Sequence, residues 1–355
     1  MTEVGLVFGG RSVEHRVSVR SARTVAQALE AAGYVVRPLA IAEDGSWASP
    51  QVAAAALAGE IEAIAPSGEA IAPSLAARFA SPPEVIFPIV HGTWGEDGTL
   101  QGLCEMLDLP YVGAGVAASA VAMDKLAAKR ILAAAGVPVV DYESARRGES
   151  ATAVAERSRR LGSPWFVKPA VGGSSVGIRK VVEAADLAVA VEFAWRFDEA
   201  VVIERGVAGR ELECAVLGYP ELEASVVGEI VPGGDFYDYE DKYLTDAAEL
   251  IAPAPLPDGV AERLRACAVK AFAALGGHGM ARVDFFLEGE ELWLNEINTL
   301  PGFTSISMYP RLWGLSGVPL GALVGRLVEA ALARHRDRSR LDRGIKEWLA
   351  ALDGS

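Results

Sequence analysis

Residues 281–298, with the sequence ARVDFFLEGEELWLNEIN, decide how the C-terminal half of the chain is interpreted. Two runs rich in apolar residues, Ala281–Leu287 and Glu291–Ile297, flank the segment Glu288-Gly289-Glu290. Short apolar runs on either side of a polar, glycine-containing segment are typical of a β-hairpin. The sequence therefore predicts two antiparallel strands joined by a short loop.

The predicted hairpin brings acidic side chains together. Side chains alternate across a strand, so Arg282 and Asp284 share one face, as do Glu296 and Asn298 on the returning strand. If residues 289–291 form the loop, Asp284 lies opposite Glu296 and Arg282 lies opposite Asn298. Facing carboxylates repel each other, and carboxylate and amide oxygens are hard ligands that suit Mg²⁺. The alternative is a solvated hairpin with scattered charges, but the neighbouring Arg282 favours a metal site.

A second segment suits an anion. Lys168 ends the apolar run Trp165–Lys168, and Gly172-Gly173-Ser174-Ser175-Val176-Gly177 follows it. A lysine contacts phosphate as a point charge, and a Gly/Ser turn lets backbone N–H groups approach the same anion. The string G-x-x-x-x-G-K-[ST] does not occur, so this is not a Walker A loop. The alternative is a flexible surface turn.

The first 120 residues predict a small doubly wound parallel domain, because apolar runs alternate with a helical pattern. We expect Ser18 to cap the first helix and Gly33 to follow its end. A ligand crevice is expected beyond the strand ends, near Gly9 and His91. The predicted elements are strands at Val4–Phe8, Val35–Ile41 and Val85–Val90 and a helix at Val19–Ala32.

The remaining segments give coarser expectations. The aromatic and polar segment Gly233–Tyr243 suits a loop that closes over a site, because tyrosine carries both apolar area and a hydroxyl. Residues 51–83 predict mixed helix and loop. We further expect a helix from about residue 120 that carries Lys125 and Lys129, a strand at Val201–Glu204, and a helical tail, Leu323–Ala351, with a charged break between Arg334 and Arg343.

Composition excludes several classes of protein. The 355 residues include 33 Lys+Arg and 47 Asp+Glu, a net charge of −14, which opposes binding to nucleic acid. Cys104, Cys214 and Cys267 are too few and too far apart for a disulfide framework or a zinc site. We identify no signal peptide and no apolar stretch long enough to span a bilayer. A cytoplasmic protein without a membrane partner is expected.

Taken in chain order, these segments resemble the D-alanine–D-alanine ligases of the ATP-grasp superfamily. The resemblance covers about residues 4 to 333. The matching stretches are Phe8–His15, His91-Gly92 with Gly95–Gly102, Met123–Lys125, Lys168-Pro169 with its Gly/Ser loop, Tyr237–Tyr243, Arg282–Asp284, Glu296–Asn298 and Pro301–Ser305.

The resemblance implies an α/β chain with a Rossmann-like N-terminal domain followed by a two-part ATP-grasp fold. The implied boundaries are 1–122 for the N-terminal domain, 123–213 for the small ATP-grasp subdomain, 214–335 for the C-terminal subdomain with the metal and second-substrate sites, and 336–355 for a helical tail.

The resemblance also implies roles for individual residues. Catalytic roles fall to Glu14, Ser174, Tyr243 and Arg282. His91 would bind substrate close to the first-substrate group, and Gly302, Ser307 and Met308 would border the second-substrate site with Arg282. ATP would contact Lys125, Lys168, Ser174, Ser175, Glu204, Glu211 and Lys242, and two Mg²⁺ (or Mn²⁺) ions would bind Asp284, Glu296 and Asn298.

The implied reaction joins two D-alanines for peptidoglycan precursors. ATP would phosphorylate the first D-alanine, the amine of the second would attack the acyl phosphate, and Arg282 would stabilise the oxyanion. The family also implies a homodimer. The alternatives are a ligase that uses D-lactate or D-serine as second substrate, and a non-catalytic nucleotide-binding regulator with the same fold.

Overall fold

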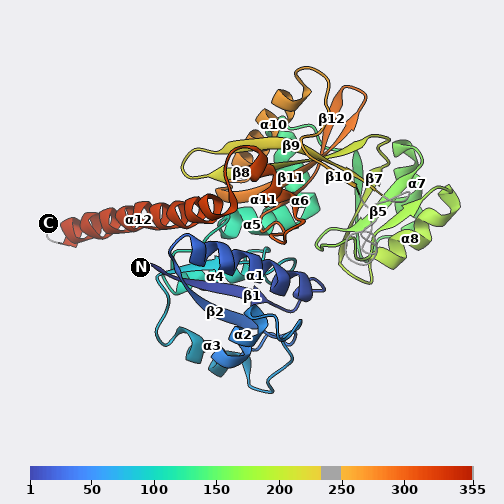
Figure 1. Ribbon diagram of the computed structural model, residues 1–355. Helices are drawn as coiled ribbons and strands as arrows, with labels where there is room; N and C mark the ends of the chain where they lie inside the picture. The colour runs from blue at the N-terminus through green and yellow to red at the C-terminus, as the bar shows by residue number, and fades with distance from the viewer. Residues whose placement is uncertain (233–248, 354–355) are drawn as a thin grey trace.

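The computed structural model describes residues 1–232 and 249–353, which form three sheets in an α/β chain (Figure 1). The N-terminal sheet is parallel and the two later sheets are antiparallel. Their strand orders are β2-β1-β3, then β4-β7-β5-β6, then β10-β9-β8-β11-β12. The predicted fold class, an α/β chain with a Rossmann-like N-terminal domain followed by a two-part ATP-grasp fold, is confirmed.

The N-terminal domain is the β-α-β unit that the sequence predicts. Its central strand is almost wholly buried, which explains the run of apolar residues. The strands are β1 (Glu3–Gly9), β2 (Val35–Ile41) and β3 (Val85–Pro88), and the helices are α1 (His15–Ala31), α2 (Pro50–Leu57), α3 (Ile71–Phe79) and α4 (Thr99–Met106). Residues 51–83 do mix helix and loop.

The prediction that Ser18 caps the first helix is wrong, because α1 begins one turn earlier, at His15. Ser18 is buried inside the helix, where its hydroxyl accepts a hydrogen bond from the Gly9 N–H at 2.8 Å and donates one to the Ile89 carbonyl at 2.6 Å. It therefore ties α1 to the ends of two strands. Gly33 follows the helix with φ +87°, as predicted.

The small antiparallel unit contains the two lysines. The predicted single helix is two helices, α5 (Val116–Met123) and α6 (Lys125–Ala134), because Asp124 between them is extended and caps α6 by accepting bonds from two backbone N–H groups. The strands are β4 (Tyr142–Arg146), β5 (Trp165–Pro169), β6 (Arg179–Val181) and β7 (Ala200–Arg205), covered by α7 (Ala151–Ser158) and α8 (Leu187–Ala194).

The C-terminal sheet contains the predicted hairpin, formed by β11 (Gly279–Glu288) and β12 (Glu291–Asn298). Asp284 faces Glu296 and Arg282 faces Asn298, as predicted. The other elements of this unit are β8 (Arg210–Gly218), β9 (Glu223–Val231), β10 (Glu249–Ile251), α10 (Val260–Ala274) and α11 (Met308–Leu315).

The hairpin turn itself is shorter than predicted. Glu288 pairs with Glu291, so only Gly289 and Glu290 form the loop, and Gly289 has φ +62°. The register then shifts between Asp284 and Phe285, which leaves one extra residue on β12. This bulge restores the predicted facing of the two acids.

The tail is one continuous helix, α12 (Leu320–Asp353), so the predicted charged break is wrong. Its first half packs in the core with the N-terminal domain, and its second half extends away from the body of the protein (Figure 1). Within the described residues, no single helix is long and apolar enough to span a membrane; the bent pair of α11 and α12 passes that test by length and composition only.

Candidate active site

A cavity of about 860 Å³ lies where the three units meet. Every predicted site residue within the described chain lines it. Lys242 and Tyr243 lie outside the described residues. The lining residues among the predicted ones are Glu14, His91, Lys125, Lys168, Ser174, Ser175, Glu204, Glu211, Arg282, Asp284, Glu296, Asn298, Gly302, Ser307 and Met308.

One side of the cavity concentrates lysines around a single acid. Glu204, at the end of β7, pairs through one oxygen with Lys129 at 2.9 Å and through the other with Lys168 at 2.6 Å. Burial opposes ionisation of Glu204, but the two lysines outweigh it and lower its pKa to about 2. Burial lowers the pKa of Lys129, partly offset by Glu204. We call Lys129, Lys168 and Glu204 the lysine cluster.

Lys129 was not among the predicted site residues. Its only signal in the sequence is its position four residues after Lys125, which places both on one face of α6. Lys125 also faces the Gly/Ser loop, because its Nζ donates to the Gly172 carbonyl at 2.8 Å. Helix α6 therefore contacts Glu204 of the lysine cluster through Lys129 and the Gly/Ser loop through Lys125.

The Gly/Ser loop approaches Glu14 closely. Ser174 and Ser175 have φ of +49° and +59°, which is uncommon for residues with a side chain and costs on the order of 1–3 kcal/mol each. A Cβ atom on Gly173 would lie 3.3 Å from a Glu14 carboxylate oxygen, and one on Gly92 would lie 2.7 Å away. Glycine at these positions lets two loops close around the Glu14 carboxylate.

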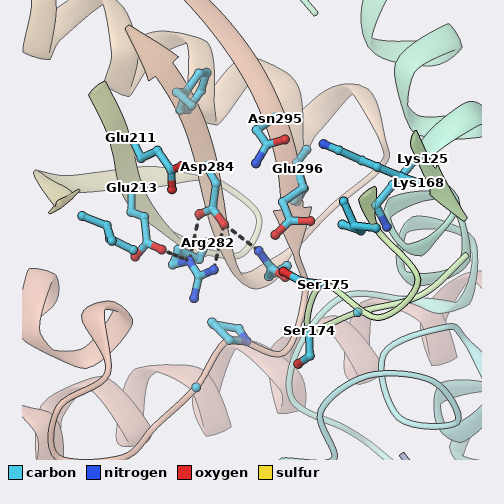
Figure 2. A pocket seen from close by; sticks show the side chains of 18 of the residues that line it. Lys125, Lys168, Ser174, Ser175, Glu211, Glu213, Arg282, Asp284, Asn295 and Glu296 are labelled. Carbon is cyan, nitrogen blue, oxygen red and sulfur yellow. Dashed lines mark hydrogen bonds and ion pairs between the residues drawn. The ribbon is translucent and has the colours of Figure 1, made fainter. Parts of the chain in front are cut away.

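The other side of the cavity concentrates acids around one arginine (Figure 2). The Arg282 guanidinium bonds both oxygens of Asp284, at 2.8 and 2.7 Å, and pairs with Glu213 at 3.0 Å. Asn298 donates to Asp284 at 2.9 Å, and Glu296 faces Asp284 across the strands. We call Arg282, Asp284, Glu213 and Glu296 the acid cluster.

Electrostatics keep Arg282 charged although it is buried. Burial opposes its charge, but Asp284 and Glu213 raise its pKa well above the ordinary value. Glu213 was not predicted as a site residue. It lies on β8 directly across from Asp284, and sequence alone does not show which strand pairs with β11.

Glu96, which the sequence did not predict as a site residue, links the N-terminal domain to the loop after β12. Its carboxylate accepts hydrogen bonds from the backbone N–H groups of Gly92, at 2.8 Å, and Leu300, at 3.0 Å. Beside it, His91 contacts the Leu300 carbonyl at 2.8 Å and Ser21 at 3.0 Å. Burial raises the pKa of Glu96 to about 8 and lowers that of His91.

The loop that follows is shaped by Gly302 and Ser307. The Ser307 hydroxyl accepts a hydrogen bond from the Thr304 N–H at 2.9 Å. A Cβ atom on Gly302 would lie 2.8 Å from the same hydroxyl, so glycine permits the close approach. Ser307 immediately precedes α11, whose first residue, Met308, is buried against the core.

Two antiparallel sheets that enclose lysine and acid clusters, behind a parallel-sheet domain, define an ATP-grasp enzyme. Family models described as D-ala D-ala ligase N-terminus and C-terminus match residues 3–114 and 131–329. The chain belongs to the D-alanine–D-alanine ligase family.

Relatives and solved structures agree with this assignment. The D-alanine–D-alanine ligase of Mycobacterium sp. (strain KMS) is 45% identical over 94% of this chain and 97% of its own. That of Nocardia farcinica (strain IFM 10152) is 47% identical over 93% and 97%. The solved D-alanine-D-alanine ligase from Coxiella burnetii superposes with a TM-score of 0.82 at 37% identity, covering 98% of this chain and 99% of that one. The VanG D-Ala:D-Ser ligase from Enterococcus faecalis gives 0.79 at 32% identity, covering 93% and 99%.

Proposed function

We propose that this protein joins two D-alanines at the expense of ATP, through a D-alanyl phosphate intermediate, to give D-alanyl-D-alanine, ADP and phosphate for peptidoglycan precursors. The observation that carries the proposal is one cavity that has the lysine cluster at one side and the acid cluster with Arg282 at the other. Such a cavity suits a triphosphate that must be held and then cleaved next to a reacting carboxyl group. We infer that the reaction occurs in the cytoplasm.

The lysine side is proposed to bind the nucleotide. Lys125 and Lys168 contact the phosphates, and the Gly/Ser loop with Ser174 and Ser175 covers them through its backbone N–H groups. Glu204 with the adjoining backbone, and Glu211, border the adenosine, and Lys242 extends to the γ-phosphate. The two ion pairs of Glu204 support this proposal, because they fix the ammonium group of Lys168 at the cavity wall.

The acid side fits two Mg²⁺ (or Mn²⁺) ions. Asp284, Glu296 and Asn298 offer two facing carboxylates and an amide, the donor types that Mg²⁺ prefers. Among the described residues no group of three or more His, Cys, Asp or Glu side chains is arranged to hold a metal ion. Mg²⁺ in proteins is usually bound by one or two carboxylates together with substrate phosphates and water. When bound, the ions supply positive charge to the triphosphate.

Other residues of this chain are proposed to position the two substrates and to stabilise the charge that develops during ligation. By the family resemblance, Glu14, Ser174 and Tyr243 would form the hydrogen-bonded group at the first-substrate site. Arg282 faces the carboxyl carbon and stabilises the oxyanion that forms when the second amine attacks. Gly302, Ser307 and Met308 border the second D-alanine, and His91 lies close to the first. Alignment of the reactants supplies roughly 7 to 11 kcal/mol of the barrier reduction.

The test is an assay of the purified protein with ATP, Mg²⁺ and D-alanine. We expect equal amounts of ADP, phosphate and dipeptide, and none without D-alanine. Folded protein that binds ATP but releases no phosphate would reject the proposal and would favour a non-catalytic nucleotide-binding regulator.

A second candidate differs only in the second substrate. It is favoured by the superposition on a D-Ala:D-Ser ligase. Competition between D-alanine, D-serine and D-lactate, with the products identified by mass, separates the candidates. Following the competition across pH further distinguishes D-lactate, because its hydroxyl and the amines of the other two acceptors respond differently to pH. We expect D-alanine to be the preferred acceptor, and a preference for either rival would replace the first proposal.

We also propose the unit boundaries 1–122, 123–213, 214–335 and 336–355, which the three separate sheets and the projecting tail support. A homodimer is proposed from the family. Sedimentation at micromolar concentration tests the dimer, and a monomer throughout would contradict it.

A further inference from the structure

The segment that joins the two antiparallel sheets borders the cavity along its whole length. Strands β7 and β8 are connected by the four residues Gly206-Val207-Ala208-Gly209. All four line the cavity, and so does Arg205, the last residue of β7. We call residues 205–209 the strap. In sequence the strap lies between Glu204 and Glu211, which are both proposed to border the adenosine, so it is placed where the base of the nucleotide would lie.

Two glycines let the strap pack tightly against both sheets. The Gly206 N–H donates to the Pro164 carbonyl at 2.6 Å, and a Cβ on Gly206 would lie 2.6 Å from the Pro164 ring. A Cβ on Gly209 would lie 2.5 Å from the Leu287 carbonyl oxygen. Pro164 immediately precedes β5 and Leu287 lies on β11. The strap is therefore confined between the small unit and the C-terminal sheet.

Glu288, the last residue of β11, holds the strap from behind. Its carboxylate accepts hydrogen bonds from both terminal nitrogens of Arg205, at 3.3 and 2.9 Å, and from the Ala208 N–H at 3.2 Å. The Arg205 guanidinium also lies over the Trp293 ring, 4.8 Å from its centre. Glu288 is not one of the described residues that line the cavity, so it acts on a ligand there only through the strap.

These contacts fix the middle of the strap. The amides of Gly206 and Ala208 are bonded to Pro164 and to Glu288. Val207 lies between these two amides and lines the cavity. It can move away from the cavity only if one of the two hydrogen bonds breaks.

We propose that Glu288 is a positioning residue for the nucleotide, which together with Arg205 holds the strap in place against the base. This inference rests on the proposed function, because it takes the ligand at the strap to be the base of ATP. A two-point contact between a carboxylate and a guanidinium fixes direction as well as distance. A strap that is fixed before the ligand arrives loses less conformational freedom on binding, so the ion pair contributes to affinity without touching the ligand.

The exposure of the ion pair separates this role from a stabilising one. The Arg205 and Glu288 side chains are 18% and 35% exposed. Ion pairs that water reaches contribute little to the free energy of unfolding. We therefore expect loss of the pair to affect nucleotide binding more than folding.

Calorimetry of ATP binding to full-length variants, without D-alanine, tests the proposal. Glu288→Ala removes both contacts with the strap and should weaken ATP binding by about three- to tenfold, as expected for hydrogen bonds of this kind. In the ligase assay KM for ATP should rise by a similar factor while kcat changes less than about twofold, the pattern of lost binding that is uniform through the reaction. Glu290→Ala removes a carboxylate from the same hairpin turn and should change neither.

A ligand without a base distinguishes positioning from a general structural effect. Inorganic tripolyphosphate has the phosphates of ATP but no base, so its affinity for Glu288→Ala should equal its affinity for wild type. Equal losses for ATP and tripolyphosphate would overturn the proposal, because the change would then extend to the phosphate side of the cavity.

A double-mutant cycle tests whether the two side chains act together. Arg205→Ala and Glu288→Ala should each weaken ATP binding, and the double variant should lose less than the product of the two single losses, because both remove the same contact. Arg205→Lys keeps the charge but not the two-point contact, and should restore only part of the affinity. Losses that multiply would overturn the pairing of the two residues.

The outcomes also separate this inference from the proposed function. Wild-type protein that binds ATP without ligating would reject the proposed function and leave the calorimetric test intact. Equal ATP affinities for wild type and Glu288→Ala would overturn this inference and leave the proposed function intact. Wild-type protein that does not bind ATP would overturn both.

Discussion

The lysine cluster and the acid cluster lie at the same cavity, which is lined on one side by Lys168 and Glu204 and on the other by the acid cluster, and they differ in the sign of the charge that predominates. In the first, one acid, Glu204, is shared by two buried lysines. In the second, one arginine, Arg282, is shared by Asp284 and Glu213, with Glu296 facing Asp284. A buried charge favours a neighbouring charge of the opposite sign, so the lysine side suits an anionic ligand and the acid side suits a cation.

The difference indicates which ligand belongs on which side. Excess positive charge on the lysine side suits the phosphates, and excess negative charge on the acid side suits magnesium. ATP with its metal ions is the one substrate that compensates both at once. The contrast between the two clusters, more than either alone, supports the proposed function.

The largest expected effect tests the acid cluster. Arg282→Ala should lower kcat by about 10²- to 10³-fold, since removing one oxyanion-stabilising group has that effect in other enzymes. Arg282→Lys keeps the charge but loses the two-point contact with Asp284, and should recover only part of the rate. Steady-state kinetics measures both, with circular dichroism and ATP binding as checks on folding. Near-normal turnover in Arg282→Ala would remove the role proposed for this residue.

The lysine cluster should contribute stability that depends on pH. The pKa of Glu204 falls from an ordinary 4.5 to about 2 in the folded protein, which corresponds to about 3 kcal/mol at neutral pH. Because the folded pKa is lowered, this contribution is complete above about pH 4.5 and is lost as the pH falls toward 2. Denaturant unfolding at pH 7 and pH 3 should show a smaller difference for Glu204→Gln than for wild type. An equal difference would contradict the ion-pair account.

A smaller effect should distinguish the lysine side of the cavity from the acid side in the binding of ATP and its metal ion. Lys168→Ala should weaken ATP binding by about tenfold, as expected when one charge-assisted hydrogen bond is lost. The matched substitution on the other side, Glu296→Gln, should weaken binding of Mn²⁺ with ATP but alter metal-free ATP binding little. Calorimetry measures the affinity of each variant for ATP with and without Mn²⁺. Equal losses of affinity in both variants under both conditions would mean that phosphate and metal are not bound on separate sides of the cavity.

The smallest effect concerns the hairpin that carries the acids. Gly289 has φ +62°, a conformation that costs a residue with a side chain about 1 kcal/mol. Gly289→Ala should lower the free energy of unfolding by that amount without changing kcat. A large loss of kcat would show that the turn, and not only the charges, controls the acid cluster.

Local patterns predicted much of this molecule. Alternation along the hairpin was enough to place Asp284 opposite Glu296, because strand periodicity is fixed by backbone geometry. The compensating bulge was not predictable, since it depends on how both strands fit the sheet. The break predicted in α12 was wrong because charged residues on a solvent-exposed helix do not interrupt it.

The missed site residues share a physical reason. Lys129, Glu213 and Glu96 act through partners distant in sequence, on β7, β11 and the loop after β12. A lone lysine on a helix or a lone acid on a strand carries no local signal of such a partner. Ser18 was wrongly predicted as a helix cap for the same reason. Its hydrogen-bond partners lie at the ends of two strands, and nothing in the local sequence indicates them.

The central claim is that the two clusters divide one nucleotide and its metal ions between them. A crystal structure with a non-hydrolysable ATP analogue and Mn²⁺ tests it directly through the anomalous signal of the metal. We predict manganese bound by Asp284, Glu296 and Asn298, with the triphosphate extending from there to Lys125 and Lys168. Manganese elsewhere, or a nucleotide seated away from both lysines, would contradict the account.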